Sequence, residues 1–220
     1  MKIANIETAG WIAATRAMRN PMNSWEKNDS FIMELSGKPV LGVNDLDLAK
    51  RLCHAGPEHR KFLRQIYVAM DITAPLYWWK EFDTYKVGTT ANSTSTMHKL
   101  TSTPITIDCF ETDDLVEDLK VFDNEPYNID ETVQDAWESV INICETLRKR
   151  YLETKDIRYW KELIRILPEG WLQTRTVTCN YETIRNIAHQ RANHKLKEWN
   201  SFLAAMEDNL PYYNELILDK

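Results

Sequence analysis

Hydroxyl side chains crowd one short stretch of the chain. Six of the eight residues from 89 to 96 are Ser or Thr, and Gly88 stands directly before them. Hydroxyl groups and the amides of a turn entered through glycine donate hydrogen bonds readily to anions. Stretches of this kind are typical of linkers or of loops that bind a polar group, and we favour the ligand-binding loop.

A second chemical feature is an arginine in a predicted C-terminal helix. Asn180 can cap this helix, because its side chain can accept a hydrogen bond from the amide of Thr183. Ile184 and Ile187 define a buried stripe, and Arg191 falls on the same stripe by helical spacing. A buried guanidinium needs an anionic or carbonyl partner. Either Arg191 forms an internal ion pair or reaches water, or it faces a cleft that receives a phosphate or carboxylate.

Metal-ligating residues form no recognised pattern around this helix. Arg185 and His189 lie four residues apart on another face, and His194 follows a predicted break. No His-x-x-x-His or Glu-x-x-His spacing accompanies them, so we predict no metal site. Surface or structural roles are expected for these histidines.

The four cysteines are widely separated. They lie at Cys53, Cys109, Cys144 and Cys179, without a Cys-x-x-Cys spacing. This argues against a zinc knuckle, a redox pair or a disulfide scaffold, and favours buried, reduced thiols. We therefore expect a cytoplasmic protein.

Charge and hydropathy exclude some partners. The net charge is −6, and no block of five or more basic residues occurs, which argues against nucleic-acid or membrane-surface binding. No apolar run reaches membrane-spanning length, and residues 1–11 lack the apolar core of a signal peptide. A small anionic ligand remains compatible with this charge.

Hydrophobic periodicity predicts the elements that must position these residues. Strands are expected at 2–7, 66–73 and 173–180. Helices are expected at 9–20, 44–56, 75–86, 130–153, 157–168 and 181–210, the last with a break near 193–194, and a helical turn at 58–65. Asn44 or Asp45 would cap the second helix, Gly56 would end it, and Pro75 would begin the third.

Together, these predicted helices and strands indicate an α+β fold, in which a small, mostly antiparallel sheet packs against several helices. The length of 220 residues fits a single domain spanning 1–220. Residues 101–127 are acidic and contain two prolines, Pro104 and Pro126. We interpret them as an insertion with one short helix.

The order of strand, Ala-Pro-Leu, aromatic helix and hydroxyl-bearing loop resembles the signature region of the flavin-dependent thymidylate synthases. In that family a helix ends in Arg-His-Arg, followed by Ser, Asn-Glu, a second Ser and Arg-Tyr. The family's C-terminal helix carries two Asn, an Arg and a later Trp. Asn180, Asn186, Arg191 and Trp199 match that spacing, with one extra residue before the Trp.

In the signature region this chain has the same order of elements as the family, but it has different residues at most of the signature positions. The positions of the family's Arg-His-Arg are occupied by Thr84, Tyr85 and Lys86. The first Ser is replaced by Thr89, and the Asn-Glu pair by Asn92-Ser93. The second Ser is matched by Ser95, and the final Arg-Tyr is replaced by Met97-His98. Glu81 falls where the family has a nucleotide-contacting Gln, His59 matches a family His, and Arg64 replaces a Glu.

The resemblance implies a set of site residues and ligands. The nucleotide, such as dUMP, would be held by Arg191, Ser95, Glu81 and Thr89. The flavin, FAD, would be lined by Tyr85, Lys86, Asn92, Asn180, Asn186 and His59. NADPH and methylenetetrahydrofolate are the implied co-substrates, and no catalytic residue is assigned beyond Arg191. The family also implies a homotetramer with shared sites, and the aromatic helix from Tyr77 to Tyr85 is a candidate contact surface.

Three functions follow from these observations. The leading hypothesis is a flavin-dependent methyltransferase acting on a pyrimidine nucleotide, in which the protein contributes orientation and electrostatics. The alternative is a non-catalytic protein that senses or sequesters a nucleotide on the same fold. The third is an oligomeric scaffold.

Overall fold

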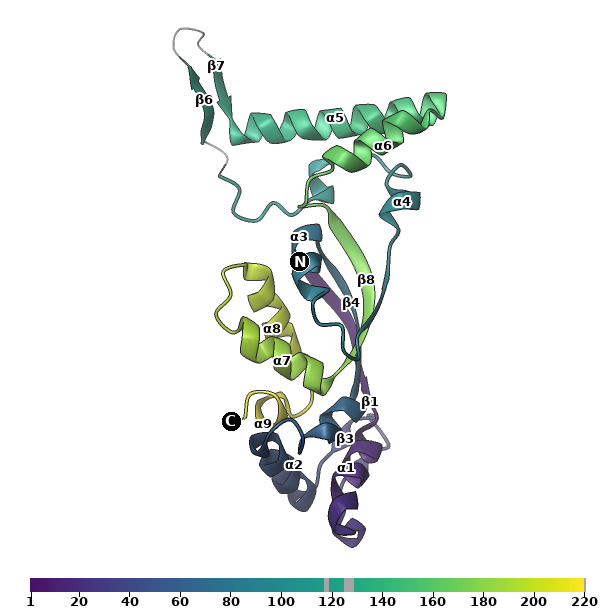
Figure 1. Ribbon diagram of the computed structural model, residues 1–220, viewed down its shortest axis with the longest axis vertical. Coiled ribbons are helices and arrows are strands. Elements are labelled where there is room, and N and C mark those ends of the chain that lie inside the picture. Colours follow the sequence, from purple (N-terminus) through teal and green to yellow (C-terminus); the bar gives the residue numbers. More distant parts are fainter. Residues whose placement is uncertain (117–118, 125–128, 220) are drawn as a thin grey trace. The chain divides into compact units, whose positions relative to one another are not determined.

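The computed structural model describes residues 1–116, 119–124 and 129–219, which form two compact units (Figure 1). The first unit contains Met1–Ile72, Phe82–Asn92 and Arg175–Lys220. The second unit contains Thr73–Glu81 and Ser93–Thr174. Each unit therefore combines segments that are distant in the sequence.

A four-stranded sheet has the strand order β1-β4-β8-β5. Its strands are β1 (Lys2–Ala9), β4 (Tyr67–Pro75), β8 (Leu172–Asn180) and β5 (Thr90–Ser93). The first three confirm the predicted strands. The fourth is a correction, because β5 occupies part of the hydroxyl-rich stretch that the sequence predicts as a loop. The fold class is α+β with a small antiparallel sheet, as predicted.

Side chains on three neighbouring strands of the first unit meet at Asp71. Asn5 of β1 donates to one carboxylate oxygen at 2.7 Å, and Thr176 of β8 donates to the other at 2.6 Å. The hydrogen bond from Thr176 and then that from Asn5 hold the pKa of Asp71 below its usual value. These hydrogen bonds link β1 and β8 to β4, which lies between them in the sheet.

Helices of the first unit pack around its aromatic core. They are α1 (Trp11–Arg19), α2 (Val43–Ala55), α7 (Tyr181–Arg191), α8 (Lys197–Asn209) and α9 (Tyr213–Leu216), with the 3₁₀ helices η1 (Asn20–Met22), η2 (Trp25–Lys27) and η3 (Lys61–Gln65). A short antiparallel hairpin pairs β2 (Phe31–Ile32) with β3 (Pro39–Val40). Trp11 and Tyr181 meet edge to face in the core, with ring centroids 5.0 Å apart. The predicted break separates α7 from α8.

The beginning of α2 corrects the predicted cap. Gly42 holds the N-cap position, so Asn44 and Asp45 lie inside the first turn. The carboxylate of Asp29 accepts hydrogen bonds from both of their amides, at 2.8 and 3.0 Å. Asp45 is instead fully buried and pairs with Arg19 at 2.6 Å. Gly56 ends the helix with a positive φ of 121°, as predicted.

The aromatic helix α3 (Leu76–Phe82) is shorter than predicted. Pro75 still belongs to β4, and the chain leaves the helix before Tyr85. The rings of Trp78, Trp79 and Phe82 are almost completely buried. The prediction that this helix forms a subunit contact surface is therefore wrong for these three side chains, because they are buried within the protein.

The second unit contains the long helices predicted from the sequence. Its elements are α4 (Thr96–Lys99), η4 (Ile107–Cys109), β6 (Lys120–Asn124), β7 (Ile129–Thr132), α5 (Val133–Thr154) and α6 (Ile157–Ile166). Thr132 and Asp135 form a reciprocal capping box that begins α5. The antiparallel pairing of β6 with β7 was not predicted. Within the predicted insertion, residues 117–118 and 125–127 lie outside the described residues.

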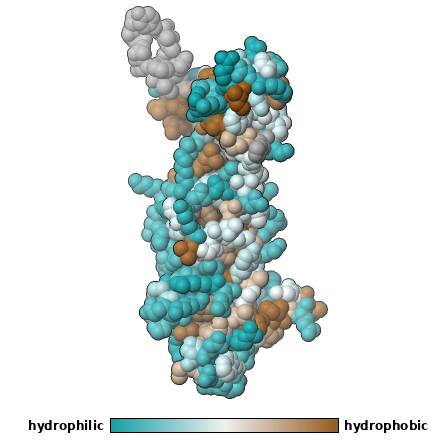
Figure 2. Space-filling view, turned by 45° about the vertical axis from the view of Figure 1, so that its right-hand side comes forward, coloured by the Kyte–Doolittle hydropathy of each residue, from teal (hydrophilic) through white to brown (hydrophobic). Residues whose placement is uncertain are grey.

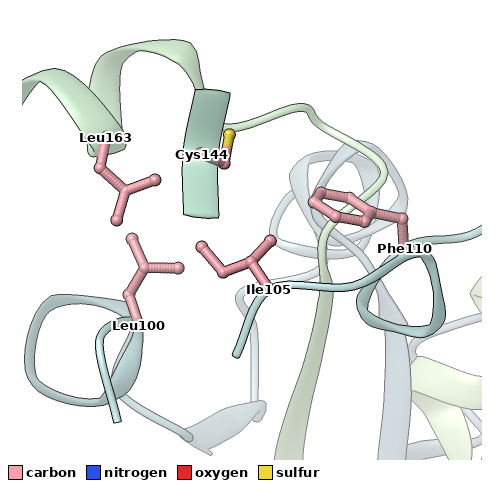
Figure 3. Packing of buried hydrophobic residues seen from close by; sticks show 5 residues of the cluster. All are labelled: Leu100, Ile105, Phe110, Cys144 and Leu163. Carbon is pink, nitrogen blue, oxygen red and sulfur yellow. The ribbon is translucent and has the colours of Figure 1, made fainter. Parts of the chain in front are cut away.

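Buried side chains from α5, α6 and the segment 100–110 form the core of the second unit (Figure 3). Leu100, Ile105, Phe110, Cys144 and Leu163 make up this cluster. Phe110 also contacts Trp171 edge to face, at 5.5 Å between centroids. Burial of these apolar side chains is the main stabilising contribution in this unit.

The cysteines are free thiols, and three of the four are buried, whereas Cys109 is only partly buried. Burial raises the pKa of Cys179 to about 12, which keeps this thiol protonated at neutral pH. Hydrophilic residues cover most of the face seen in Figure 2. Among the helices that the structure describes, none has the length and apolar character needed to cross a membrane.

Candidate functional site

Helix α7 begins as the sequence predicts. The side chain of Asn180 accepts a hydrogen bond from the amide of Thr183 at 3.0 Å and so caps the helix. The buried positions include Ile184 and Ile187, as expected. They also include Arg185, which was placed on another face. Arg191, which the spacing predicts on the same stripe, is only half-buried.

Arg185 is the buried arginine of this helix, and its partners are internal. One terminal nitrogen donates to the carbonyls of Leu216 and Ile217 at 3.1 and 3.0 Å. Both terminal nitrogens bind the carboxylate of Asp219. His189 makes a further hydrogen bond with the carbonyl of Ile217 at 2.9 Å. The two side chains therefore hold the C-terminal segment against α7.

Arg191 lies beside two aromatic side chains at the end of the same helix. Its Nε donates to the hydroxyl of Tyr85 at 3.0 Å. Its guanidinium carbon lies 5.7 Å from the centre of the Tyr85 ring and 4.8 Å from that of Trp199. These are cation–π distances. We call Tyr85, Arg191 and Trp199 the aromatic clamp.

A cavity of about 360 Å³ opens beside the aromatic clamp, on the side of Tyr85. Its lining residues are Phe82, Asp83, Tyr85, Lys86, Thr89 and Ala91. The hydroxyl of Thr89 is buried and has no hydrogen-bond partner among the described residues. Asp83 is paired with Arg175 at 2.7 Å. The structure thus brings together three predicted site residues, Tyr85, Lys86 and Thr89.

The loop that carries these residues is tied to the beginning of α7. The hydroxyl of Thr183 donates to the carbonyl of Val87 at 3.2 Å. Gly88 has a φ of 72°, and a Cβ atom there would lie 2.5 Å from Nδ2 of Asn180. A larger residue would be strained and would also collide with the helix cap.

Other predicted site residues lie elsewhere. Asn92 and Asn186 are exposed side chains of β5 and α7. His59 lines a different cavity, of about 720 Å³, together with residues of α1, α2 and η3. Glu81 and Ser95 belong to the second unit, so the geometry of the first unit leaves their part in the site as a prediction.

Two residues of this region were not predicted as part of the site. Trp199 matches the family spacing but was given no role, and Gln190 accepts a hydrogen bond from the hydroxyl of Tyr85 at 3.0 Å. The usable signal for Trp199 was an aromatic residue eight positions after an arginine, across a helix break. Gln190 gives no local sequence signal.

The chemistry of this region suits an anionic ligand that also carries a flat ring. Arg191 and Lys86 supply positive charge, and Thr89 supplies a hydroxyl without a protein partner in the described structure. The cavity volume lies near the lower end of the ~300–1,000 Å³ that small-molecule sites occupy. No group of described residues has the composition of a metal site.

Two solved structures of the flavin-dependent thymidylate synthase ThyX from Helicobacter pylori align with the whole chain. One, complexed with FAD and dUMP, has a TM-score of 0.67 and 18% identity, covering 100% of this chain and 99% of that one. The other, also with FAD and dUMP, has a TM-score of 0.69 and 17% identity, covering 100% and 98%. The chain has the fold of the flavin-dependent thymidylate synthases.

A third structure extends this fold comparison. It is the UMP/dUMP methylase PolB from Streptomyces cacaoi bound with 5-Br dUMP, with a TM-score of 0.60 and 13% identity, covering 99% of this chain and 90% of that one. No protein-family model and no curated protein sequence matches the chain. Because the sequence identities are only 13–18%, structural similarity rather than sequence similarity establishes the fold.

Proposed function

We propose that the protein is an enzyme of the flavin-dependent thymidylate synthase type, which adds a one-carbon unit to a pyrimidine deoxynucleotide such as dUMP. The observation that carries this proposal is the aromatic clamp. Its arginine is held by Tyr85, which also lines a cavity with a lysine and a hydroxyl, on a fold that also occurs in proteins solved with dUMP. Guanidinium groups are well suited to bind phosphate and other anionic groups.

The residues of the first unit are chemically compatible with FAD. Lys86 is exposed at the cavity and offers a positive charge to a phosphate, and the unpartnered hydroxyl of Thr89 offers a hydrogen bond. Asn186 is exposed and could contact a flavin, whereas the side-chain oxygen of Asn180 is used by the helix cap. A bound flavin would supply hydride chemistry, with NADPH as reductant and methylenetetrahydrofolate as the one-carbon donor.

Within this proposal the protein binds and orients its ligands. Arg191 would hold the nucleotide through its guanidinium group. Cys179 is not a nucleophile, because burial keeps its thiol protonated. On the family resemblance, catalysis would depend on positioning and electrostatics rather than on a covalent bond from a side chain.

The direct test combines spectroscopy with ligand binding. The purified protein, with and without added FAD, should show a bound-flavin absorption spectrum. Calorimetry should show dUMP binding, and incubation with dUMP, methylenetetrahydrofolate and NADPH should yield the methylated nucleotide. Binding of neither FAD nor dUMP would reject the proposal.

A specific observation favours a second candidate, a non-catalytic nucleotide-binding protein. Tyr85, which stands within the flavin signature, is engaged by Arg191 and Gln190 instead. Under this alternative dUMP binds with the affinity expected for a functional site, whereas the absorption spectrum does not change when FAD is added. The two measurements together separate the two candidates.

We also propose a homotetramer with shared sites, on the family resemblance. Light scattering after size-exclusion chromatography should give four times the mass of one chain. A monomer that retains full dUMP affinity would show that each site is complete within one subunit.

A further inference from the structure

Tyr85 is hydrogen-bonded to two residues at the end of α7. Its hydroxyl accepts a hydrogen bond from Nε of Arg191 and donates one to the side-chain oxygen of Gln190, both at 3.0 Å. One hydroxyl thus has both an acceptor and a donor role, which fixes the direction of its O–H bond. Arg191 is therefore held by a hydroxyl group that has a fixed orientation of its own.

The ring of Tyr85 is itself held by the buried core of the first unit. Its centroid lies 6.4 Å from that of Phe82 and 6.1 Å from that of Trp199, with the second pair nearly perpendicular at 73°. Phe82 and Trp199 are 1% and 0% exposed. Rotation of the tyrosine would therefore disturb packed aromatic side chains.

Arg191 is constrained by this arrangement at more than one point. The hydrogen bond at Nε fixes one edge of the guanidinium, and the Trp199 ring, at 4.8 Å, lies closer to its carbon than the Tyr85 ring does. A free arginine side chain loses rotamer entropy when it binds a ligand. A guanidinium that is already oriented loses less when it meets a ligand.

We propose that Tyr85 is a positioning residue, which orients Arg191 for the ligand rather than contacting a cofactor itself. This role rests on the proposed function, because it assumes that Arg191 binds the nucleotide. With Nε directed at Tyr85, Arg191 meets the nucleotide through its terminal nitrogens. Those nitrogens can bind two oxygen acceptors side by side, as on a phosphate.

A double-mutant cycle tests this role in the full-length protein. Dissociation constants for dUMP are measured for the wild type, Tyr85→Phe, Arg191→Ala and the double variant. Tyr85→Phe keeps the ring and removes the hydroxyl, and it should weaken binding about tenfold, as for the loss of a hydrogen bond to a charged group. In the Arg191→Ala background the same change should have no further effect. Tyr67→Phe, at an exposed tyrosine of β4, is the matched control and should bind dUMP normally.

Two results of the cycle would overturn the proposal. Equal fold-losses in both backgrounds would mean that Tyr85 contacts the ligand directly. An unchanged dissociation constant in Tyr85→Phe would mean that Arg191 does not need the hydroxyl.

A second measurement needs no ligand. The Nε–H proton of Arg191, assigned by its loss in Arg191→Lys, should exchange slowly with solvent in the wild type and rapidly in Tyr85→Phe. Fast exchange in the wild type, or slow exchange in both proteins, would also overturn the positioning role. If the wild type binds no dUMP, the proposed function fails, and this exchange rate alone decides whether Tyr85 holds Arg191.

Discussion

Two arginines on α7 lie six residues apart in very different surroundings. The side chain of Arg185 is 6% exposed and binds two carbonyls and a carboxylate of the C-terminal segment. Arg191 is half-buried, donates to a tyrosine hydroxyl and lies over a tryptophan ring. The first arginine is bound by acceptors of its own chain, and this points to a structural role. The second is oriented by aromatic side chains beside a cavity, and this points to a ligand.

The largest effect should come from removing Arg185. Arg185→Ala leaves the carboxylate of Asp219 and two carbonyls without their donor, and the free energy of unfolding should fall by about 3–5 kcal/mol. Urea unfolding followed by circular dichroism measures this change. Arg158→Ala, at an arginine that is 86% exposed, is the control and should cost far less, because exposed ion pairs contribute little to stability. Equal losses in the two variants would show that the C-terminal contacts of Arg185 contribute little.

Removing Arg191 should affect binding more than stability. Arg191→Ala should weaken dUMP binding by about 1.5–3 kcal/mol, the range for a hydrogen bond to a charged group. The free energy of unfolding should fall by less than in Arg185→Ala, since Arg191 is half-buried and hydrogen bonds and cation–π contacts at partly exposed sites each contribute about 1 kcal/mol. Lys195→Ala removes an exposed positive charge four residues further on and should leave dUMP binding intact. Normal dUMP affinity in folded Arg191→Ala would remove this arginine from the site.

The pairing of Arg185 with Asp219 also predicts a dependence on pH. Burial alone would raise the pKa of Asp219, but the hydrogen bond and charge of Arg185 lower it below its usual value. A carboxylate with a lowered folded-state pKa stabilises the fold fully above its unfolded pKa, and this stabilisation is lost as the pH falls below about 4. The difference in free energy of unfolding between wild type and Asp219→Asn should therefore shrink in acid. A difference that stays constant from neutral pH to acid would contradict the ion pair.

The smallest effect is expected at Thr89. Thr89→Val keeps the shape and removes a buried hydroxyl that has no hydrogen-bond partner in the described structure, so stability should stay within about 1 kcal/mol or rise slightly. Affinity for dUMP or FAD should fall a few-fold if the ligand uses this hydroxyl. Thr90→Val, at the exposed neighbour, is the matched control. Identical ligand affinities in both variants would place the ligand outside this cavity.

Elements with long, regular apolar spacing were predictable from sequence. Local periodicity predicts the helices α5 and α6 and the strands β4 and β8, because apolar residues recur along each of them at the spacing of a helix or a strand. The short pairs β2–β3 and β6–β7 and the edge strand β5 were missed, since two to five residues give no period. The cap of α2 was misassigned because Asp29, its real acceptor, lies more than ten residues upstream.

The site was predicted in part, and the error on α7 has a physical reason. Most of its first two turns, from Tyr181 to Ala188, is buried, so a search for one apolar stripe could not distinguish Arg185 from Arg191. The partners of Arg185 lie about thirty residues further on, beyond any local pattern. Tyr85, Lys86 and Thr89 come from the family resemblance. The structure places them at one cavity because they are close together in the sequence, and their roles stay a prediction.

Gly88 has a consequence for how this region can change by mutation. Its left-handed backbone would be strained with any other residue, and a Cβ atom there would lie 2.5 Å from Nδ2 of Asn180, which would have to shift. In a library containing every single substitution, position 88 should lose nearly all variants. The exposed neighbours Lys86 and Val87 should tolerate many replacements in a selection for folding alone. The chemistry of the loop can therefore diverge widely while its path along the chain stays fixed.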